Sequence, residues 1–269
     1  MLYQEELIAR VREVCAADEE LNAALMYGSF AAGEADAHSD IEFWLFFTPQ
    51  RRAALDPRAW CEQIAPVGYG LLNEFGAYVA FFSGLVRGEF HFATVDDIAG
   101  VGDWPGRGGP VERMLVVDRD GLLGPVLKAL PQRYAPDPDD PGVIAEYCDP
   151  FVNWLVLACH LAARGEDLRA WDALGHIQRH LVWMARLAER STGHWLTPSR
   201  AAERELSAAT VAELRASTCI ASTEASAQAM LAALKLGRRL WQVLADRFGE
   251  AVPTALLDEI ESALDRRQR

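Results

Sequence analysis

The stretch at residues 131–142, PQRYAPDPDDPG, places four prolines within a short span near the middle of the chain. Proline fixes φ and lacks a backbone N–H, so this stretch can form neither a helix nor an interior strand. The distribution of apolar residues before this stretch differs from that after it. It therefore predicts a linker that joins two domains, residues 1–130 and residues 143–269.

The first part alternates helical and strand-like segments. Residues 5–15 carry apolar side chains three and four positions apart, which is the spacing of a helix with one buried face. Short apolar runs that read as strands follow at residues 23–27, 41–47, 79–82, 89–95 and 114–118. The pattern predicts a sheet combined with helices.

The second part has the character of a helical bundle. Apolar positions recur with helical spacing at residues 151–164, 168–190, 226–248 and 255–267. Gly165, Gly193 and Gly249 fall near the ends of these segments, where C-terminal caps belong. The chain as a whole is predicted to be α+β, with a sheet-containing domain followed by helices.

Bulk properties exclude several classes of function. The net charge of −13 disfavours a nucleic-acid partner, because phosphate backbones would be repelled. No uncharged apolar run approaches the ~20 residues that cross a membrane, and the start lacks the layout of a secretory signal, so we expect a cytoplasmic protein. The five cysteines are scattered, which favours buried thiols over a zinc site or a disulfide framework.

Two acidic residues occupy one face of an otherwise apolar strand. In the strand at residues 41–47, Asp40 and Glu42 point to one face, and Ile41, Phe43 and Leu45 point to the other. Carboxylates at positions i and i+2 are roughly 6.5 Å apart at the backbone, so their oxygens can converge on Mg2+. An acid-x-acid pair is usually a solvated strand edge, but an unpartnered carboxylate among aromatic residues is costly. We therefore favour a catalytic role.

A Gly-Ser pair precedes this strand by ten residues. Gly28 allows a sharp turn and close approach to a ligand. Backbone N–H groups in the turn, together with the Ser29 hydroxyl, could hold phosphate. A Gly-Ser pair alone is usually a plain turn, so the prediction depends on its combination with Asp40 and Glu42.

The combined pattern resembles the DNA polymerase beta-like nucleotidyltransferase superfamily, whose signature is apolar-Gly-Ser, about ten residues, then Asp-apolar-Asp/Glu. The stretches MYGSFAAGEADAHSDIEFWLFF and LVRGEFHF, with NEFG between them, more specifically resemble the two-domain lincosamide nucleotidyltransferases. The resemblance implies a mixed sheet of the polymerase beta type, a helical substrate-binding domain and a Mg2+ cofactor. It also implies transfer of AMP from ATP to a hydroxyl of a lincosamide, which would make the chain an antibiotic-resistance enzyme.

The superfamily uses a third carboxylate from a later strand. We choose Glu89, because alternation places it with Arg87 and His91 on one face of its strand, and the corresponding Glu of the family supports this choice. The residue would act as metal ligand, general base or both. The other candidates are Glu74, which fits a loop, and the pair Asp96 and Asp97, which fit the cap of a helix beginning near Ile98.

Other readings compete with lincosamide transfer. Aminoglycoside nucleotidylation uses the same scaffold but calls for a dense acidic cluster, whereas the acids of the helical part are scattered among arginines. Modification of a protein partner is typical of shorter chains. A catalytically dead nucleotide-binding scaffold is disfavoured by the three retained acids. The resemblance is also compatible with a homodimer.

Overall fold

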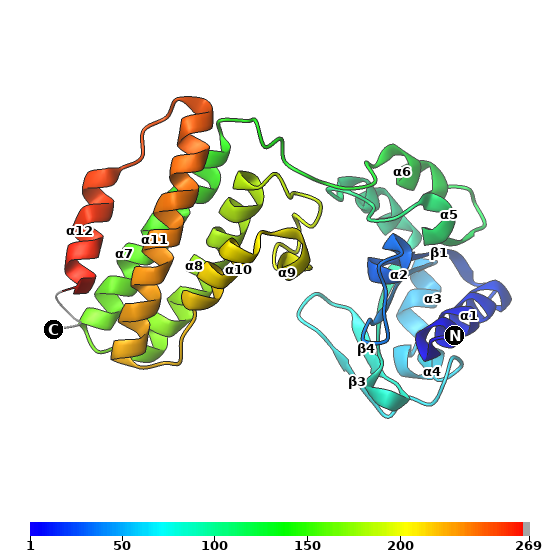
Figure 1. The fold of residues 1–269 in the computed structure, drawn as a ribbon. Coiled ribbons are helices and arrows are strands. Elements are labelled where there is room, and N and C mark those ends of the chain that lie inside the picture. The colour runs from blue at the N-terminus through cyan, green and yellow to red at the C-terminus, as the bar shows by residue number, and fades with distance from the viewer. Residues whose placement is uncertain (266–269) are drawn as a thin grey trace. The chain divides into compact units, whose positions relative to one another are not determined.

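The structure, a computed structural model, describes residues 1–265, and the chain divides into two units (Figure 1). The first unit spans Met1–Tyr134 and the second begins at Ala135. Strands and helices alternate in the first, and the second is helical. The predicted α+β fold, with a mixed sheet and helices followed by a helical part, is confirmed.

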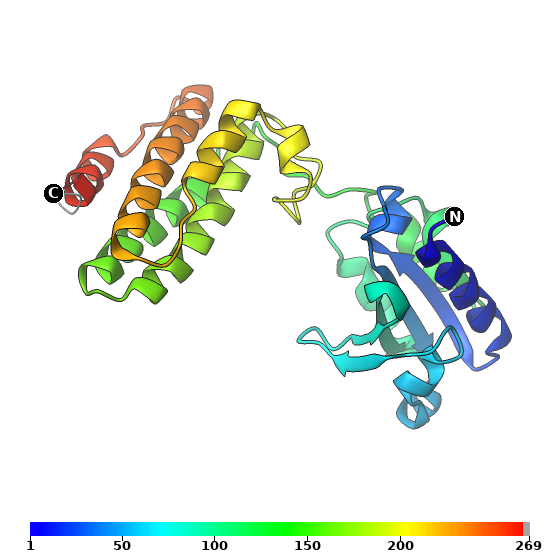
Figure 2. The same ribbon diagram turned by 60° about the horizontal axis from the view of Figure 1, so that its bottom comes forward.

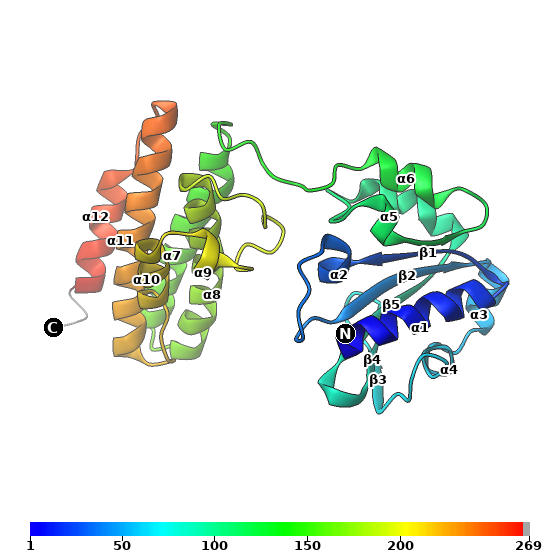
Figure 3. The same ribbon diagram turned by 45° about the vertical axis from the view of Figure 1, so that its right-hand side comes forward.

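Among the described residues, one six-stranded sheet forms in the order β3-β4-β5-β2-β1-β6 (Figure 3). Strand β2 pairs in parallel with β5, and the other neighbours are antiparallel, so the sheet is mixed. The strands are β1 (Leu21–Tyr27), β2 (Ile41–Phe47), β3 (Tyr69–Leu72), β4 (Tyr78–Phe81), β5 (Arg87–Thr94) and β6 (Leu115–Asp118). The sequence predicted all of these except β3.

The helices of the first unit are mostly short. The predicted helix at residues 5–15 is confirmed as α1. The other α-helices of this unit were not predicted, although two of them have a local start signal: Thr48 caps α3 and Asp56 caps α4, and a proline follows each cap. The helices are α1 (Tyr3–Ala17), α2 (Gly28–Ala32), α3 (Pro49–Ala54), α4 (Pro57–Cys61), α5 (Val111–Met114) and α6 (Leu123–Ala129), with 3-10 turns η1 (Ser83–Leu85) and η2 (Val95–Asp103).

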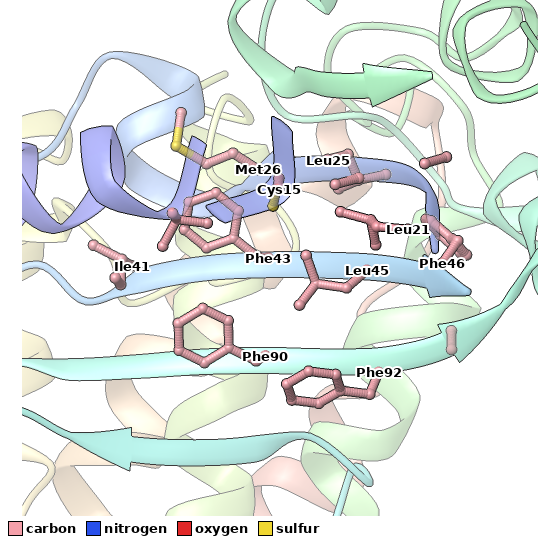
Figure 4. Close-up of a cluster of buried hydrophobic side chains, with 14 of the residues drawn as sticks. Cys15, Leu21, Leu25, Met26, Ile41, Phe43, Leu45, Phe46, Phe90 and Phe92 are labelled. Atoms are coloured by element: carbon pink, nitrogen blue, oxygen red, sulfur yellow. The ribbon is translucent and has the colours of Figure 1, made fainter. Parts of the chain in front are cut away.

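A large part of the core of this unit lies against one face of the sheet (Figure 4). Ile41, Phe43 and Leu45 of β2 are fully buried, and the Phe43 ring stacks on Phe90 of β5 at 5.8 Å between centroids. Side chains of β1 and α1 complete the cluster. Because alternate side chains of a strand point to opposite faces, this apolar face leaves Asp40 and Glu42 on the other side.

Three long helices of the second unit lie side by side (Figure 2). Gly249 has a φ of 69° and caps α11 as predicted, whereas the prediction for Gly193 was wrong. Arg190, with a φ of 55°, takes the left-handed position after α8, and the next N–H, of Ser191, donates to Arg186 O at 2.8 Å. The elements are η3 (Ile144–Cys148), α7 (Asp149–Ala163), α8 (Asp167–Ala188), α9 (Ala202–Glu205), α10 (Ala208–Ala216), α11 (Thr223–Phe248) and α12 (Thr254–Asp265).

Two expectations from composition can be compared with the described residues. No helix within residues 1–265 is both long and apolar enough to cross a membrane. All five cysteines are free thiols, and Cys15, Cys61 and Cys148 are buried. Burial raises the pKa of Cys15 and of Cys148 to about 12, so these thiols are protonated and unreactive. The end of the helix predicted at residues 255–267 lies outside the described residues.

Candidate active site

Strand pairing aligns three polar side chains in one row across the sheet. Tyr27 of β1 lies opposite Glu42 of β2, and Glu42 lies opposite Glu89 of β5. Residues directly opposite each other project from the same face, so the row stands on the face away from the core. Asp40, just before β2, joins this row because it is two residues from Glu42. The structure thus brings the three predicted carboxylates together.

Arg87 is the cation of this face. Its Nε donates to Asp40 Oδ2 at 3.1 Å, and its Nη2 makes a closer contact with the same oxygen. Nη2 also lies 3.5 Å from Glu89 Oε2. The sequence left open whether Arg87 would bind phosphate or pair with Glu89. In the structure, it links Asp40 and Glu89.

Glu42 lies closest to the Gly-Ser turn. A Cβ atom placed on Gly28 would be 1.5 Å from Glu42 Oε2, so only glycine leaves room for this carboxylate. The backbone N–H of Ser29 donates to Glu42. Burial raises the pKa of Glu42 to about 7, and the negative charges of Asp40 and Glu89 add to this effect, whereas Arg87 and the Ser29 N–H oppose it.

The turn differs in one respect from the prediction. Gly28 has a φ of 72° and begins the short helix α2, as a sharp turn after β1 requires. The Ser29 N–H, expected to bind phosphate, is instead engaged by Glu42. Ser29 is 7% exposed, and its Oγ has no hydrogen-bond partner within the described structure. A buried hydroxyl without a partner costs about 1–3 kcal/mol, so the hydrogen-bonding capacity of Oγ is unused in this structure.

The two oxygens of Glu89 have different neighbours. Oε1 accepts a hydrogen bond from the Tyr27 hydroxyl at 3.1 Å and lies 3.4 Å from His91 Nε2. Oε2 faces Arg87. His91 stacks on Trp44 with ring centroids 4.1 Å apart. Burial lowers the pKa of His91 despite the opposing effect of Glu89, and burial followed by the charges of Glu42 and Glu89 raises the pKa of Tyr27.

The remaining acidic candidates do not join the row. Glu74 is exposed in the turn between β3 and β4, where the neighbouring Asn73 side chain accepts two backbone N–H groups. Asp97 accepts the backbone N–H of Thr94 at 2.8 Å and so caps η2, which agrees with the predicted capping role. Asp96 is exposed in the first turn of the same element.

The donor atoms of the row suit a hard divalent cation such as Mg2+, since they are carboxylate oxygens. The burial and mutual repulsion that raise the pKa of Glu42 show that one arginine does not fully neutralise the cluster. Within residues 1–265, however, no group of three or more His, Cys, Asp or Glu side chains is arranged to hold a metal ion. Arg87 lies between two of the carboxylates instead, so the metal-ligand assignment of Asp40, Glu42 and Glu89 stays a prediction.

Sequence reasoning assigned no role to Tyr27. The signal was present, because an antiparallel pairing of the segments on either side of the Gly-Ser turn places Tyr27 opposite Glu42. Its hydrogen bond to Glu89 depends on the order of three strands, which local alternation does not give.

Comparison with known proteins gives a family for the helical part. Residues 143–263 match the family described as lincosamide nucleotidyltransferase-like, C-terminal domain. Comparison with curated proteins gave no match. The chain is also similar to the crystal structure of an aminoglycoside 6-adenyltransferase from Bacillus subtilis, at 12% identity and a TM-score of 0.45, over 98% of this chain and 97% of that one. A nucleotidyltransferase-like protein from Exiguobacterium sibiricum 255-15 gives 12% identity and a TM-score of 0.39, over 98% and 89% of the two chains. The helical part of this chain, residues 143–263, is therefore similar to the lincosamide nucleotidyltransferase-like C-terminal domain family.

Proposed function

We propose that this protein transfers AMP from ATP to a hydroxyl group of a lincosamide and releases pyrophosphate. The observation that carries the proposal is that Asp40, Glu42 and Glu89 lie on one face of the sheet, and that the Ser29 hydroxyl of the adjacent turn is buried without a hydrogen-bond partner. Like-charged carboxylates are costly to hold together, and a cation bound with a polyphosphate would relieve that cost. The C-terminal domain family supports the same activity.

Asp40, Glu42 and Glu89 would hold Mg2+, which neutralises charge on the triphosphate and on the leaving pyrophosphate. The Ser29 hydroxyl donates to a phosphate oxygen of ATP. Glu89 accepts the proton of the acceptor hydroxyl, whose oxygen forms a bond to the α-phosphorus. The bond between the α-phosphorus and the bridging oxygen of the β-phosphate breaks, and pyrophosphate leaves. These residues act mainly by positioning and by electrostatics.

The acceptor assignment rests on the helical part. The family there is named for lincosamide nucleotidyltransferases, and we extend that acceptor to this chain. One cavity of the helical unit, about 630 Å³, has the size of a drug-binding site. Its walls include Trp183, Leu196 and Pro198, its polar rim includes Arg179, and its lining contains no carboxylate. A polycationic aminoglycoside would be poorly matched to this lining, which favours the lincosamide.

The test is a turnover assay with ATP, Mg2+ and either lincomycin or kanamycin, with products identified by mass. We expect a mass gain of one AMP on lincomycin alone. Adenylylated kanamycin would replace the proposed acceptor with an aminoglycoside. Absence of product from both drugs, in protein that binds ATP, would favour a nucleotide-binding scaffold.

The site assignment is tested by Asp40→Asn and Glu42→Gln. Each removes a negative charge that would hold Mg2+, so we expect turnover to fall on the order of 100-fold or more. Glu74→Gln is the matched control, because it neutralises an exposed acid in a turn away from the row. Turnover of either site variant within about tenfold of wild type would contradict the proposed ligand roles.

A further inference from the structure

The Tyr27 side chain extends beyond the residue that lies opposite it on the neighbouring strand. It lies opposite Glu42, and Glu89 lies one strand further along the row. Neighbouring strands are about 4.8 Å apart, so roughly 9.6 Å of sheet separates the backbones of Tyr27 and Glu89. The Tyr27 hydroxyl nevertheless lies 3.1 Å from Glu89 Oε1. The phenol side chain therefore spans the width of β2 above Glu42.

The Tyr27 ring is held in this extended position by aromatic neighbours. Its centroid is 6.0 Å from that of His91 and 6.2 Å from that of Trp104, with the rings tilted by 56° and 60°. His91 is itself stacked on Trp44. These contacts involve the ring and not the hydroxyl, so a phenylalanine at this position can keep them.

The hydrogen bond makes the two oxygens of Glu89 unequal. Oε1 is engaged by the Tyr27 hydroxyl and lies near His91 Nε2, whereas Oε2 faces the Arg87 guanidinium and, beyond it, Asp40. A carboxylate fixed through one oxygen presents the other in a defined direction. Oε2 is consequently the oxygen on the side of the carboxylate cluster.

We propose that Tyr27 is a positioning residue, which fixes Glu89 through Oε1 so that Oε2 faces the bound cation and the acceptor hydroxyl. The proposal rests on the nucleotidyl transfer proposed above and adds a residue to that site. A purely structural role for Tyr27 would depend on the aromatic ring alone. Tyr27→Phe keeps the ring and removes only the hydroxyl, so it separates the two roles.

We expect Tyr27→Phe to lower kcat about tenfold, which corresponds to one hydrogen bond. The KM values for ATP and acceptor should change little, because in this proposal the hydroxyl acts on Glu89 and not on either substrate. Tyr69→Phe is the matched control, since Tyr69 is exposed on the edge strand β3 and the substitution removes the same atom. Tyr69→Phe should leave kcat unchanged, and both variants should keep the melting temperature of wild type.

The second readout does not require turnover. Mn2+ binding is measured by electron paramagnetic resonance in the wild type, Tyr27→Phe, Glu89→Gln and the double variant. We expect Tyr27→Phe to weaken Mn2+ binding several-fold in the wild-type background and to have no further effect when Glu89 is already Gln.

The outcomes separate this inference from the proposed function. Wild-type kcat and Mn2+ affinity in Tyr27→Phe would overturn the positioning role, as would an equal loss of Mn2+ affinity in the Glu89→Gln background. A wild-type protein that binds Mn2+ but modifies no acceptor would refute the proposed function, while the four Mn2+ titrations would still decide the coupling. A wild type that binds no Mn2+ would overturn both.

Discussion

Arg87 occupies the position at which the proposed site would bind a divalent cation. We therefore expect Arg87 to stabilise the metal-free protein and to weaken its affinity for the metal. The side chain pairs with Asp40 and with Glu89. A metal ion held by these carboxylates would have to displace the guanidinium from them. Arg87→Gln removes the positive charge and keeps a polar but shorter side chain.

The size of the effect follows from the exposure of the ion pairs. The Arg87 side chain is 46% exposed, and those of Asp40 and Glu89 are 27% and 14% exposed. Solvent therefore screens both pairs, and each is worth about 0.5–1 kcal/mol. Loss of the two pairs should destabilise the metal-free protein by about 1–2 kcal/mol, or roughly 3–10 °C in the melting temperature of this unit.

The same contacts oppose metal binding in the wild type. Since a tenfold change in affinity corresponds to about 1.4 kcal/mol, Arg87→Gln should bind Mn2+ about 5- to 30-fold more tightly. Thermal unfolding without metal and calorimetric titration with Mn2+ measure the two effects. Arg10→Gln provides the control, because Arg10 forms an exposed pair with Glu13 away from the row.

Two results would refute this reasoning. If Arg87→Gln binds Mn2+ more weakly than wild type, Arg87 supports the metal site and does not compete with the cation. If neither the melting temperature nor the Mn2+ affinity changes, the ion pairs contribute nothing measurable. The control should change both quantities by no more than the experimental error.

Two further predictions concern other parts of the chain. Gly28→Ala should lower the melting temperature through about 1–2 kcal/mol of backbone strain. It should also reduce turnover, because the added Cβ displaces Glu42. Gly76→Ala is the control: Gly76 also has a positive φ, but a Cβ there would have nothing within 4 Å, so this variant should lose stability and keep turnover. In the helical unit, burial acts to raise the pKa of Glu205, but hydrogen bonds from Arg186 and His194 hold that pKa below its usual value. The stabilisation is therefore present above the pKa of the unfolded chain and is lost as pH falls through the lowered pKa. Glu205→Gln should lower the melting temperature at neutral pH, and the further fall of the melting temperature below about pH 4.5 should be smaller than in the wild type. An equal fall below that pH in both proteins would contradict this.

The faces of β2 and β5 could be predicted from the sequence, because side-chain alternation is a local property. Ile41 and Phe43 are buried and Glu42 is on the opposite face, as the alternation of residue types indicated. The long helices were found for the same reason, since helical periodicity needs no knowledge of the partner. The burial of the Ser29 hydroxyl and the position of Gly28 beside Glu42 depend on tertiary structure, which the sequence pattern does not give.

The elements that were missed lack a periodic pattern or depend on distant contacts. Strand β3 is a four-residue edge strand that contains a glycine and has no buried side chain, so its sequence carries no alternation. Arg190 takes a left-handed conformation that residue type disfavours, and its side chain pairs with Asp139 at 2.6 Å. The ion pair of Arg87 with Asp40 joins residues 47 positions apart, and no local rule gives the register that brings them together.

The apolar core explains why the carboxylates stay together despite their repulsion. In the parallel pairing of β2 with β5, the register that stacks Phe43 on Phe90 is the same register that places Glu42 opposite Glu89. A slip of β2 by one residue would carry Phe43 to the opposite face and Glu42 into the core. Burial of each phenylalanine is worth about 1.5–3 kcal/mol, and an unpaired carboxylate in the core would cost more. Core packing therefore holds the strands in this register, although burial and then the charges of Asp40 and Glu89 raise the pKa of Glu42.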